Sequence, residues 1–235
     1  MSLRLRGVNF SYRRKSHNLI DVNLDIGPGT TAILGENGAG KSTLLRVLAT
    51  ELRCSSGEIS FGGTHLTPST IREFRKLSGW VPQGEMIQPS ETPFEFVSKV
   101  AWLRGLNGRE LRRSTRAALE RVALSAEANI RASRLSGGMK RRAAIAAGVV
   151  HNPTYLLLDE PTAGLDPILR EQHIEQLRSL SDTGVHVLFS SHISADVEEA
   201  DNLVVMSQGT VAHHSPTDVL RQEYGSIQNA YRHFF

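Results

Sequence analysis

One glycine-rich loop constrains the fold of this chain more than any other segment. Residues 35–43 read Gly-Glu-Asn-Gly-Ala-Gly-Lys-Ser-Thr and fit the pattern G-x-x-x-x-G-K-[ST]. The run at 31–34 predicts a buried strand before the loop, and residues 43–48 predict a helix after it. Glycines let the loop curl until its N–H groups point inward, and the helix N-terminus adds unpaired donors. The segment therefore predicts a site for the phosphates of a nucleoside triphosphate.

The loop combines backbone donors with two side chains of clear chemistry. Lys41 supplies a positive charge for the β- and γ-phosphates, and Ser42 offers a hydroxyl to Mg²⁺. The predicted nucleotide contacts in the loop are Gly35, Asn37, Gly38, Ala39, Gly40, Lys41, Ser42 and Thr43.

Composition narrows the class of protein. The chain has 235 residues, of which 40% are hydrophobic and 22% charged, as expected for one large globular domain or two closely joined lobes. The sequence contains no run of about 18 apolar residues, so we predict no membrane span. The N-terminus also lacks the apolar core of a signal peptide. Cys54 is the single cysteine, so we expect no internal disulfide and no thiolate metal site, which fits a reducing cytoplasm.

Positive charge is concentrated in one stretch. Residues 99–142 contain twelve Lys or Arg and three Glu, whereas the net charge of the whole chain is +3. This stretch is either a solvated helical face or a surface for anionic lipid headgroups, an acidic partner or nucleic acid. Few aromatic residues lie among the basic ones, which argues against a platform for stacking bases, so we predict no nucleic-acid partner.

The remaining pattern predicts an α/β fold. Apolar runs at 155–158 and 185–189 predict short strands covered on both faces, and residues 167–180 between them predict a helix. This order is typical of a parallel sheet. Residues 1–35, 57–63 and 77–83 predict further strands and turns, while 93–150 predict three helices. Residues 220–235 predict a short tail without a recognisable motif.

Two further groups of residues suit the binding and hydrolysis of a nucleotide. Asp159 and Glu160 follow the strand at 155–158, and ligands bind at this end of strands in open α/β sheets. Asp159 suits Mg²⁺, and Glu160 suits the orientation and deprotonation of an attacking water. Ser136 is a good helix cap, but the glycines at 137 and 138 weaken a first helical turn and are better explained by an anion that approaches the backbone.

Taken in order, these motifs resemble the nucleotide-binding subunit of an ABC (ATP-binding cassette) transporter, from about Arg4 to Val219. The matching elements are the loop 35–43, Gln83 in Val81-Pro82-Gln83, the signature Leu135–Gly138, Asp159-Glu160, the loop Ala163-Gly164-Leu165-Asp166 and His192 in Ser190-Ser191-His192. Each motif is weak alone, whereas six in family order form a specific signal. The resemblance implies a P-loop nucleoside triphosphatase fold with a mixed sheet core.

The resemblance also implies how the chain is divided. Residues 1–83 and 151–235 would form the core together with an N-terminal antiparallel β subdomain. Residues 84–150 would form an inserted α-helical subdomain that carries the signature, and the whole of 1–235 would be one ABC ATPase domain.

In this family, two cassettes pair head to tail with two ATP molecules between them. The resemblance therefore implies a homodimer with ATP and Mg²⁺, in which Ser136, Gly137, Gly138 and Asp166 contact ATP in trans. Asp166 also suits the start of a helix before Pro167.

Within one copy, the resemblance assigns catalysis to Glu160, His192 and Lys41. The predicted ligands of Mg²⁺ are Ser42, Gln83 and Asp159, and Gln83 also belongs to the ATP contacts. Tyr12 matches the aromatic residue that stacks on adenine, and the alternative is a strand tyrosine that packs on its neighbours.

Three details resemble cassettes of drug and antibiotic exporters: Met139 where the family often has Gln, the stretch 191–198, and Trp102–Leu106. The resemblance then implies a separate integral membrane permease, docked on the helical subdomain, and a cytoplasmic position on the inner face of the membrane. Two alternatives stay open, import instead of export and a soluble single cassette, for example in cluster assembly.

Overall fold

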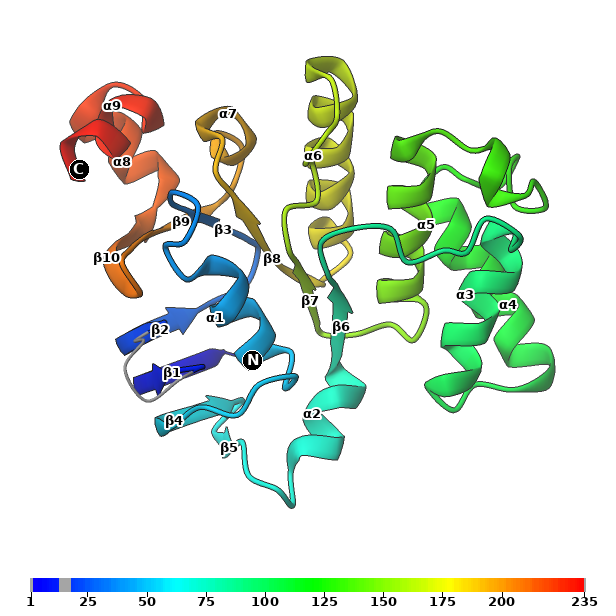
Figure 1. Ribbon diagram of the computed structural model, residues 1–235, viewed down its shortest axis with the longest axis horizontal. Coiled ribbons are helices and arrows are strands. Elements are labelled where there is room, and N and C mark those ends of the chain that lie inside the picture. Colours follow the sequence, from blue (N-terminus) through cyan, green and yellow to red (C-terminus); the bar gives the residue numbers. More distant parts are fainter. Residues whose placement is uncertain (1, 13–17, 235) are drawn as a thin grey trace.

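The computed structural model describes residues 2–12 and 18–234, which form two sheets and the helices packed around them (Figure 1). The strands are β1 (Leu3–Phe10), β2 (Leu19–Ile26), β3 (Thr30–Leu34), β4 (Ser56–Phe61), β5 (Thr64–His65), β6 (Ser78–Val81), β7 (Tyr155–Leu158), β8 (His186–Ser191), β9 (Asn202–Ser207) and β10 (Thr210–Pro216). The helices are α1 (Lys41–Leu48), α2 (Ile71–Leu77), α3 (Pro93–Leu103), α4 (Gly108–Arg121), the 3-10 helix η1 (Ala132–Arg134), α5 (Gly137–Val149), α6 (Pro167–Asp182), α7 (Ser194–Val197), α8 (Thr217–Tyr224) and α9 (Ile227–Phe234).

The larger sheet has six strands in the order β10-β9-β3-β8-β7-β6. Strands β9, β3, β8, β7 and β6 run parallel to their neighbours, and β10 is antiparallel to β9, which confirms the predicted mixed core. The smaller sheet is antiparallel, in the order β2-β1-β4-β5, and confirms the N-terminal β subdomain. Parallel pairing places the carboxyl ends of β3, β8, β7 and β6 at one edge, where their loops meet.

The six-stranded sheet separates two apolar clusters, as expected when both faces of parallel strands are covered. In β3, Ala32 and Leu34 belong to one cluster, together with residues of α5, α6 and the helices around them. Ile33 between them belongs to the other cluster, with α1 and the smaller sheet. Alternation along the strand therefore holds α5 and α6 against one face, and α1 with the β subdomain against the other.

Helices α3 to α5 occupy the predicted helical region. α3 begins at a capping box, in which Thr92 Oγ1 accepts from Glu95 N and Glu95 Oε2 accepts from Thr92 N. α5 begins directly after Ser136, as expected. All of these helices contribute to the apolar cluster on that face of the sheet. The exact boundaries 1–83, 84–150 and 151–235 stay a prediction.

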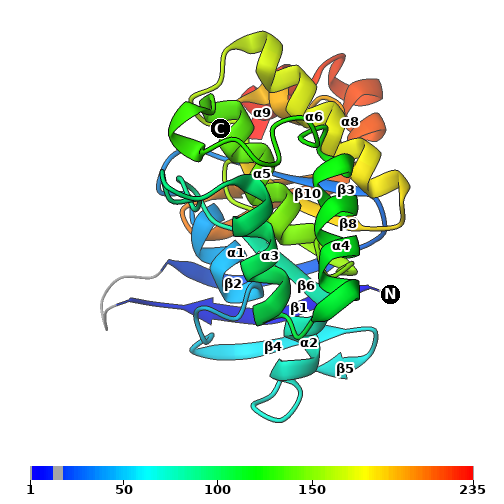
Figure 2. The same ribbon diagram turned by 90° about the vertical axis from the view of Figure 1, so that its right-hand side faces the viewer.

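Five of the twelve basic residues in 99–142 lie on α4, which faces the viewer in Figure 2. Arg109, Arg112, Arg113 and Arg116 are all exposed, whereas Ala118 and Leu119 are buried against the neighbouring helices. This placement agrees with both alternatives, a solvated helical face and a surface for an anionic partner.

The C-terminal region, for which the sequence showed only a short tail without a recognisable motif, is helical. Residues 217–234 form α8 and α9, and Leu220, Ile227 and Ala230 are fully buried in the same cluster as α7. Gly225, with φ of +77°, ends α8 and separates the helices. Each helix has eight residues, too few for a clear period in the sequence, so their burial depends on tertiary packing.

Within residues 2–12 and 18–234, no helix is both long enough and apolar enough to cross a membrane.

The packing of α5 on β6 generates a prediction about stability. A Cβ atom on Gly79 of β6 would lie 2.1 Å from the backbone oxygen of Gly148 in α5. We expect Gly79→Ala to force strand and helix apart and to lower the free energy of unfolding by about 1–3 kcal/mol. Denaturant unfolding measures this loss. Gly27→Ala is the control, because nothing lies within 4 Å of its added Cβ, and an equal loss in both variants would contradict the packing argument.

Candidate nucleotide-binding site

The glycine-rich loop connects β3 to α1 and packs closely against neighbouring backbone. A Cβ on Gly35 would lie 2.4 Å from the backbone oxygen of Met206, and one on Gly40, whose φ is +102°, would lie 2.7 Å from that of Asn18. The first bond of α1 runs from Leu44 N to Gly40 O at 2.8 Å. The N–H groups of residues 41–43 therefore have no partner within the helix and suit an anion.

Lys41 lies at the base of the loop and is only 4% exposed. Its Nζ donates to the backbone oxygens of Gly35 at 2.7 Å and Glu36 at 3.0 Å. Burial lowers the pKa of Lys41, while Glu160 and Asp159 oppose this shift. The ammonium group is thus held in a desolvated position, where its attraction for phosphate oxygens is stronger than in water.

Asp159 joins three elements at the edge of the sheet. Its Oδ1 accepts from Ser42 Oγ of α1 at 2.9 Å and from Ser190 Oγ of β8 at 2.7 Å. Asp159 is 4% exposed, and these hydroxyl donors compensate the burial of its carboxylate. The predicted pair of magnesium ligands, Ser42 and Asp159, is therefore already in hydrogen-bond contact.

Glu160 forms the centre of a second group. Its Oε2 accepts from Gln83 Nε2 at 3.3 Å, and its Oε1 lies 3.2 Å from Nδ1 of His192. Because a carboxylate oxygen only accepts, the contact with His192 requires a hydrogen on Nδ1. Glu160 N donates to Ser190 Oγ at 2.9 Å, so the same serine contacts both acidic residues.

A cavity of about 430 Å³ collects most of the predicted site residues. It is lined by Asn18, Asn37, Gly38, Gly40, Lys41, Ser42, Thr43, Gln83, Glu160 and His192. The structure thus brings together the loop, the glutamine, the acidic residue and the histidine from four separate segments. Asp159 lies behind this lining, where it contacts Ser42.

Tyr12 lies outside this lining. Tyr12 is 49% exposed, and its ring packs edge-on against Phe10 at 4.8 Å between ring centroids. Its hydroxyl accepts from Arg46 Nη1 at 3.1 Å. Residues 13–17 beside it lie outside the described part of the chain. Adenine stacking by Tyr12 stays a prediction.

The signature residues also lie outside the cavity. Ser136 caps α5 by accepting from Met139 N at 3.2 Å, Gly137 is exposed, and Gly138 is buried near the ring of His173. Asp166 Oδ1 caps α6 by accepting from Ile168 N and Leu169 N, both at 3.1 Å. These four residues therefore do not line the cavity of their own copy, and their contacts with ATP in trans stay a prediction.

The comparison with known families decides the identity of this arrangement. The family model described as ABC transporter matches residues 19–163, which include the loop, the glutamine, the signature and the acidic pair. The chain belongs to the ABC transporter family. Its relatives include ATP-binding proteins of export and of amino-acid transport systems.

The Nod factor export ATP-binding protein I of Rhizobium etli is 35% identical over 207 residues, which cover 87% of this chain and 65% of the relative. The linearmycin resistance ATP-binding protein LnrL of Bacillus subtilis is 35% identical over 189 residues, 80% of this chain and 60% of the relative. The chain thus spans slightly less than two thirds of these two relatives. The arginine transport ATP-binding protein ArtP of Haemophilus influenzae is 32% identical over 228 residues, 93% of each protein.

Solved structures of this family share the fold. The structure of cbiO1 of Clostridium perfringens, part of the ABC transporter complex cbiONQ, has 31% identity and a TM-score of 0.85, with 94% of this chain and 90% of that chain covered. A dimeric ATP-binding cassette bound to ADP and Pi has 25% identity and a TM-score of 0.80, with 92% and 98% covered.

Several residues of this site were not indicated by the sequence pattern. Ser190 contacts both acidic residues, although its motif was noted only for His192. Asp196 is 1% exposed, accepts from Thr162 Oγ1 at 2.5 Å and from Ser191 Oγ at 2.7 Å, and pairs with Arg170. The sequence does contain a signal for these contacts, namely two consecutive serines at the end of an apolar strand. Polar side chains at buried positions need hydrogen-bond partners, so the two serines indicate polar groups nearby.

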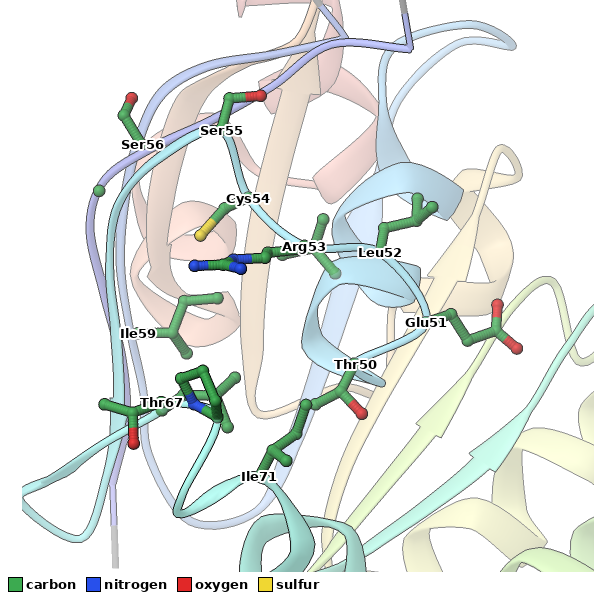
Figure 3. A pocket seen from close by; sticks show the side chains of 14 residues that line it. Thr50, Glu51, Leu52, Arg53, Cys54, Ser55, Ser56, Ile59, Thr67 and Ile71 are labelled. Carbon is green, nitrogen blue, oxygen red and sulfur yellow. The ribbon is translucent and has the colours of Figure 1, made fainter.

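A larger cavity of about 560 Å³ lies away from this chemistry, between the end of α1, β4 and the start of α2 (Figure 3). Leu52, Cys54, Ile59 and Ile71 are among its lining residues. We place the nucleotide in the smaller cavity, because the unpaired helix donors, the lysine and the acidic residues lie there.

Lys41→Ala tests the phosphate site. Loss of the buried ammonium removes charge-assisted hydrogen bonds to phosphate, so we expect ATP affinity to fall by about 10- to 100-fold. Isothermal titration calorimetry with ATP measures the change. Lys76→Ala, at an exposed position on α2, is the control and should keep its affinity. Unchanged binding by Lys41→Ala would contradict the placement of the phosphates.

Proposed function

We propose that this cassette binds and hydrolyses ATP and thereby powers a separate membrane permease that exports a small molecule. One observation carries the ATPase proposal. A single cavity is lined by the glycine-rich loop with Lys41 and Ser42, by Gln83, by Glu160 and by His192, although these residues come from four segments of the chain. Family membership and the names of the export relatives support the transport proposal.

The donor set fits ATP with Mg²⁺. The unpaired N–H groups at the start of α1 and Nζ of Lys41 suit triphosphate oxygens. Mg²⁺ prefers oxygen ligands and usually shares them with substrate phosphates, so a hydroxyl and one or two side-chain oxygens are sufficient. Ser42 and Asp159 supply these, with Gln83 nearby in the cavity lining. When bound, Mg²⁺ would neutralise charge on the phosphates.

The chemistry of the site residues follows from their contacts. Glu160 orients the attacking water and accepts its proton, while Gln83 and His192 hold the Glu160 carboxylate in place. Lys41 stabilises the negative charge that develops on the transferred phosphoryl group.

Two copies would complete the site. The unpaired N–H groups at the start of α5, beside Ser136 and Gly137, suit the ATP held by the other copy, and Asp166 lies in the loop that would contact it. A two-fold dimer then contains two equal sites, because each chain carries both halves. The dimeric cassette with ADP and Pi supports this assembly.

The end of α3 is the surface that we assign to the permease. Trp102 is 65% and Leu103 is 69% exposed, which is unusual for two adjacent large apolar residues. The next residue, Arg104, donates to the backbone oxygen of Arg75 in α2 and so joins this surface to the core. Docking there would place the cassette on the cytoplasmic face of the membrane.

The arginine transport relative keeps import open, and a soluble cassette is the remaining alternative.

Glu160→Gln tests the chemical role. The amide keeps the shape of the side chain but is a very weak base, so we expect ATP affinity to persist while turnover falls by about 10²- to 10⁴-fold. Phosphate release measures turnover, and size-exclusion chromatography with ATP should show the dimer accumulating. Glu171→Gln, exposed on α6, is the control. Undiminished turnover in Glu160→Gln would refute the proposed base.

A double variant tests the docking surface. Trp102→Ser combined with Leu103→Ser removes the exposed apolar side chains, so we expect it to lose co-purification with the permease encoded in the neighbouring reading frame, while ATPase activity of the isolated cassette persists. Val219→Ser, a 47% exposed position on α8, is the control for loss of a surface hydrophobe. Full recovery of the complex with the double variant would exclude this surface, and absence of a neighbouring permease would favour the soluble alternative.

A further inference from the structure

The backbone at Glu160 has an unusual conformation. Its φ is +46°, in the left-handed region that favours glycine. A residue with a Cβ persists there only where its surroundings impose the conformation. The contacts around Glu160 therefore show what holds the carboxylate in position.

Arg141 of α5 contacts the chain on both sides of Glu160. Its Nη2 donates to Asp159 O at 2.8 Å, and its Nε donates to Pro161 O at 3.2 Å. Its Nη1 donates to Pro82 O, the residue before Gln83, at 2.8 Å. One planar guanidinium thus binds three backbone oxygens, which a flexible ammonium with a single nitrogen cannot match.

The peptide group that precedes Glu160 is held at both ends. Arg141 binds its oxygen, and Ser190 Oγ accepts from its N–H at 2.9 Å. The Pro161 oxygen is held as well, so rotation about the Glu160 backbone is restricted from both sides. Burial lowers the pKa of Arg141 to about 10, which still leaves the guanidinium charged near neutral pH.

Arg141 also lies one helical turn after Gly137, at the start of the signature helix. A small cavity of about 180 Å³ is lined by Gly137, Arg141 and Glu160, together with Gly164 and Leu165. The guanidinium of Arg141 therefore connects the first turn of α5 directly to the segment that carries Glu160.

We propose that Arg141 is a positioning residue that holds Glu160 in its left-handed conformation and links the position of α5 to that of the carboxylate. The inference rests on the proposed role of Glu160 as the base. In a dimer, α5 would meet the nucleotide of the other copy, so Arg141 would couple closure at one ATP site to the base of the second.

Arg141→Ala and Arg141→Lys test this role in the full chain. Because the hydrogen bonds of Arg141 go to Asp159, Pro161 and Pro82, outside the glycine-rich loop, affinity for a fluorescent ATP analogue should persist, while kcat falls by about 10- to 100-fold in Arg141→Ala. Arg141→Lys should recover part of the activity, since Lys donates to fewer of the three oxygens. Arg142→Ala is the matched control, because Arg142 is a neighbour on the same helix and donates a long hydrogen bond, of 3.4 Å, to Gln172 Oε1.

A double-mutant cycle separates positioning from general support of the fold. If Arg141 acts through Glu160, Arg141→Ala causes no further loss of single-turnover hydrolysis in a Glu160→Gln background. An equal fold-loss in both backgrounds, or wild-type kcat in Arg141→Ala, would overturn the inference while the role of Glu160 stands. Wild-type turnover in Glu160→Gln alone would overturn the proposed base and this inference with it.

Discussion

Parallel hydrogen bonding between β3, β8, β7 and β6 is the interaction on which the rest of this cassette depends. The register pairs Leu34 with Ser191, Leu158 with Phe189, and Val81 with Leu158. The four strands therefore end together, and the loops that follow them carry Lys41, His192, Glu160 and Gln83 to one cavity. A slip of one residue in any pair would turn its apolar side chains to the wrong cluster and move its functional residue along the edge.

Around that edge, each buried charge is matched by specific partners. The Asp159 carboxylate is compensated by the hydroxyls of Ser42 and Ser190, and the Lys41 ammonium by two carbonyl oxygens of its own loop. Unpaired buried charges are far more costly than paired ones. These contacts keep the groups close together before a nucleotide is bound, so little reorganisation is needed when phosphates enter.

The sequence predicted an element or a site correctly where a local residue pattern and the chemistry of its side chains indicate the same structure. The strand at 155–158, the helix after Ser136 and the loop 35–43 lie where their patterns predict, and the mixed sheet and family were predicted correctly. The helices α8 and α9 were not predicted, because each is short and its apolar residues are buried only by packing in the cluster that includes α7. Arg141 and Ser190 were missed as site residues because their partners are distant in sequence. The roles in trans, and that of Tyr12, depend on groups that a single chain does not supply.

At Glu160, the residue that best suits the left-handed backbone differs from the residue that the chemistry requires. Glycine adopts this φ without a steric penalty, whereas a residue with a Cβ pays about 1–3 kcal/mol for an unfavourable backbone conformation. Selection for a more stable cassette would therefore favour glycine at 160 and eliminate the carboxylate. A screen that ranks variants of this protein by melting temperature alone would enrich inactive molecules at the site where activity matters most.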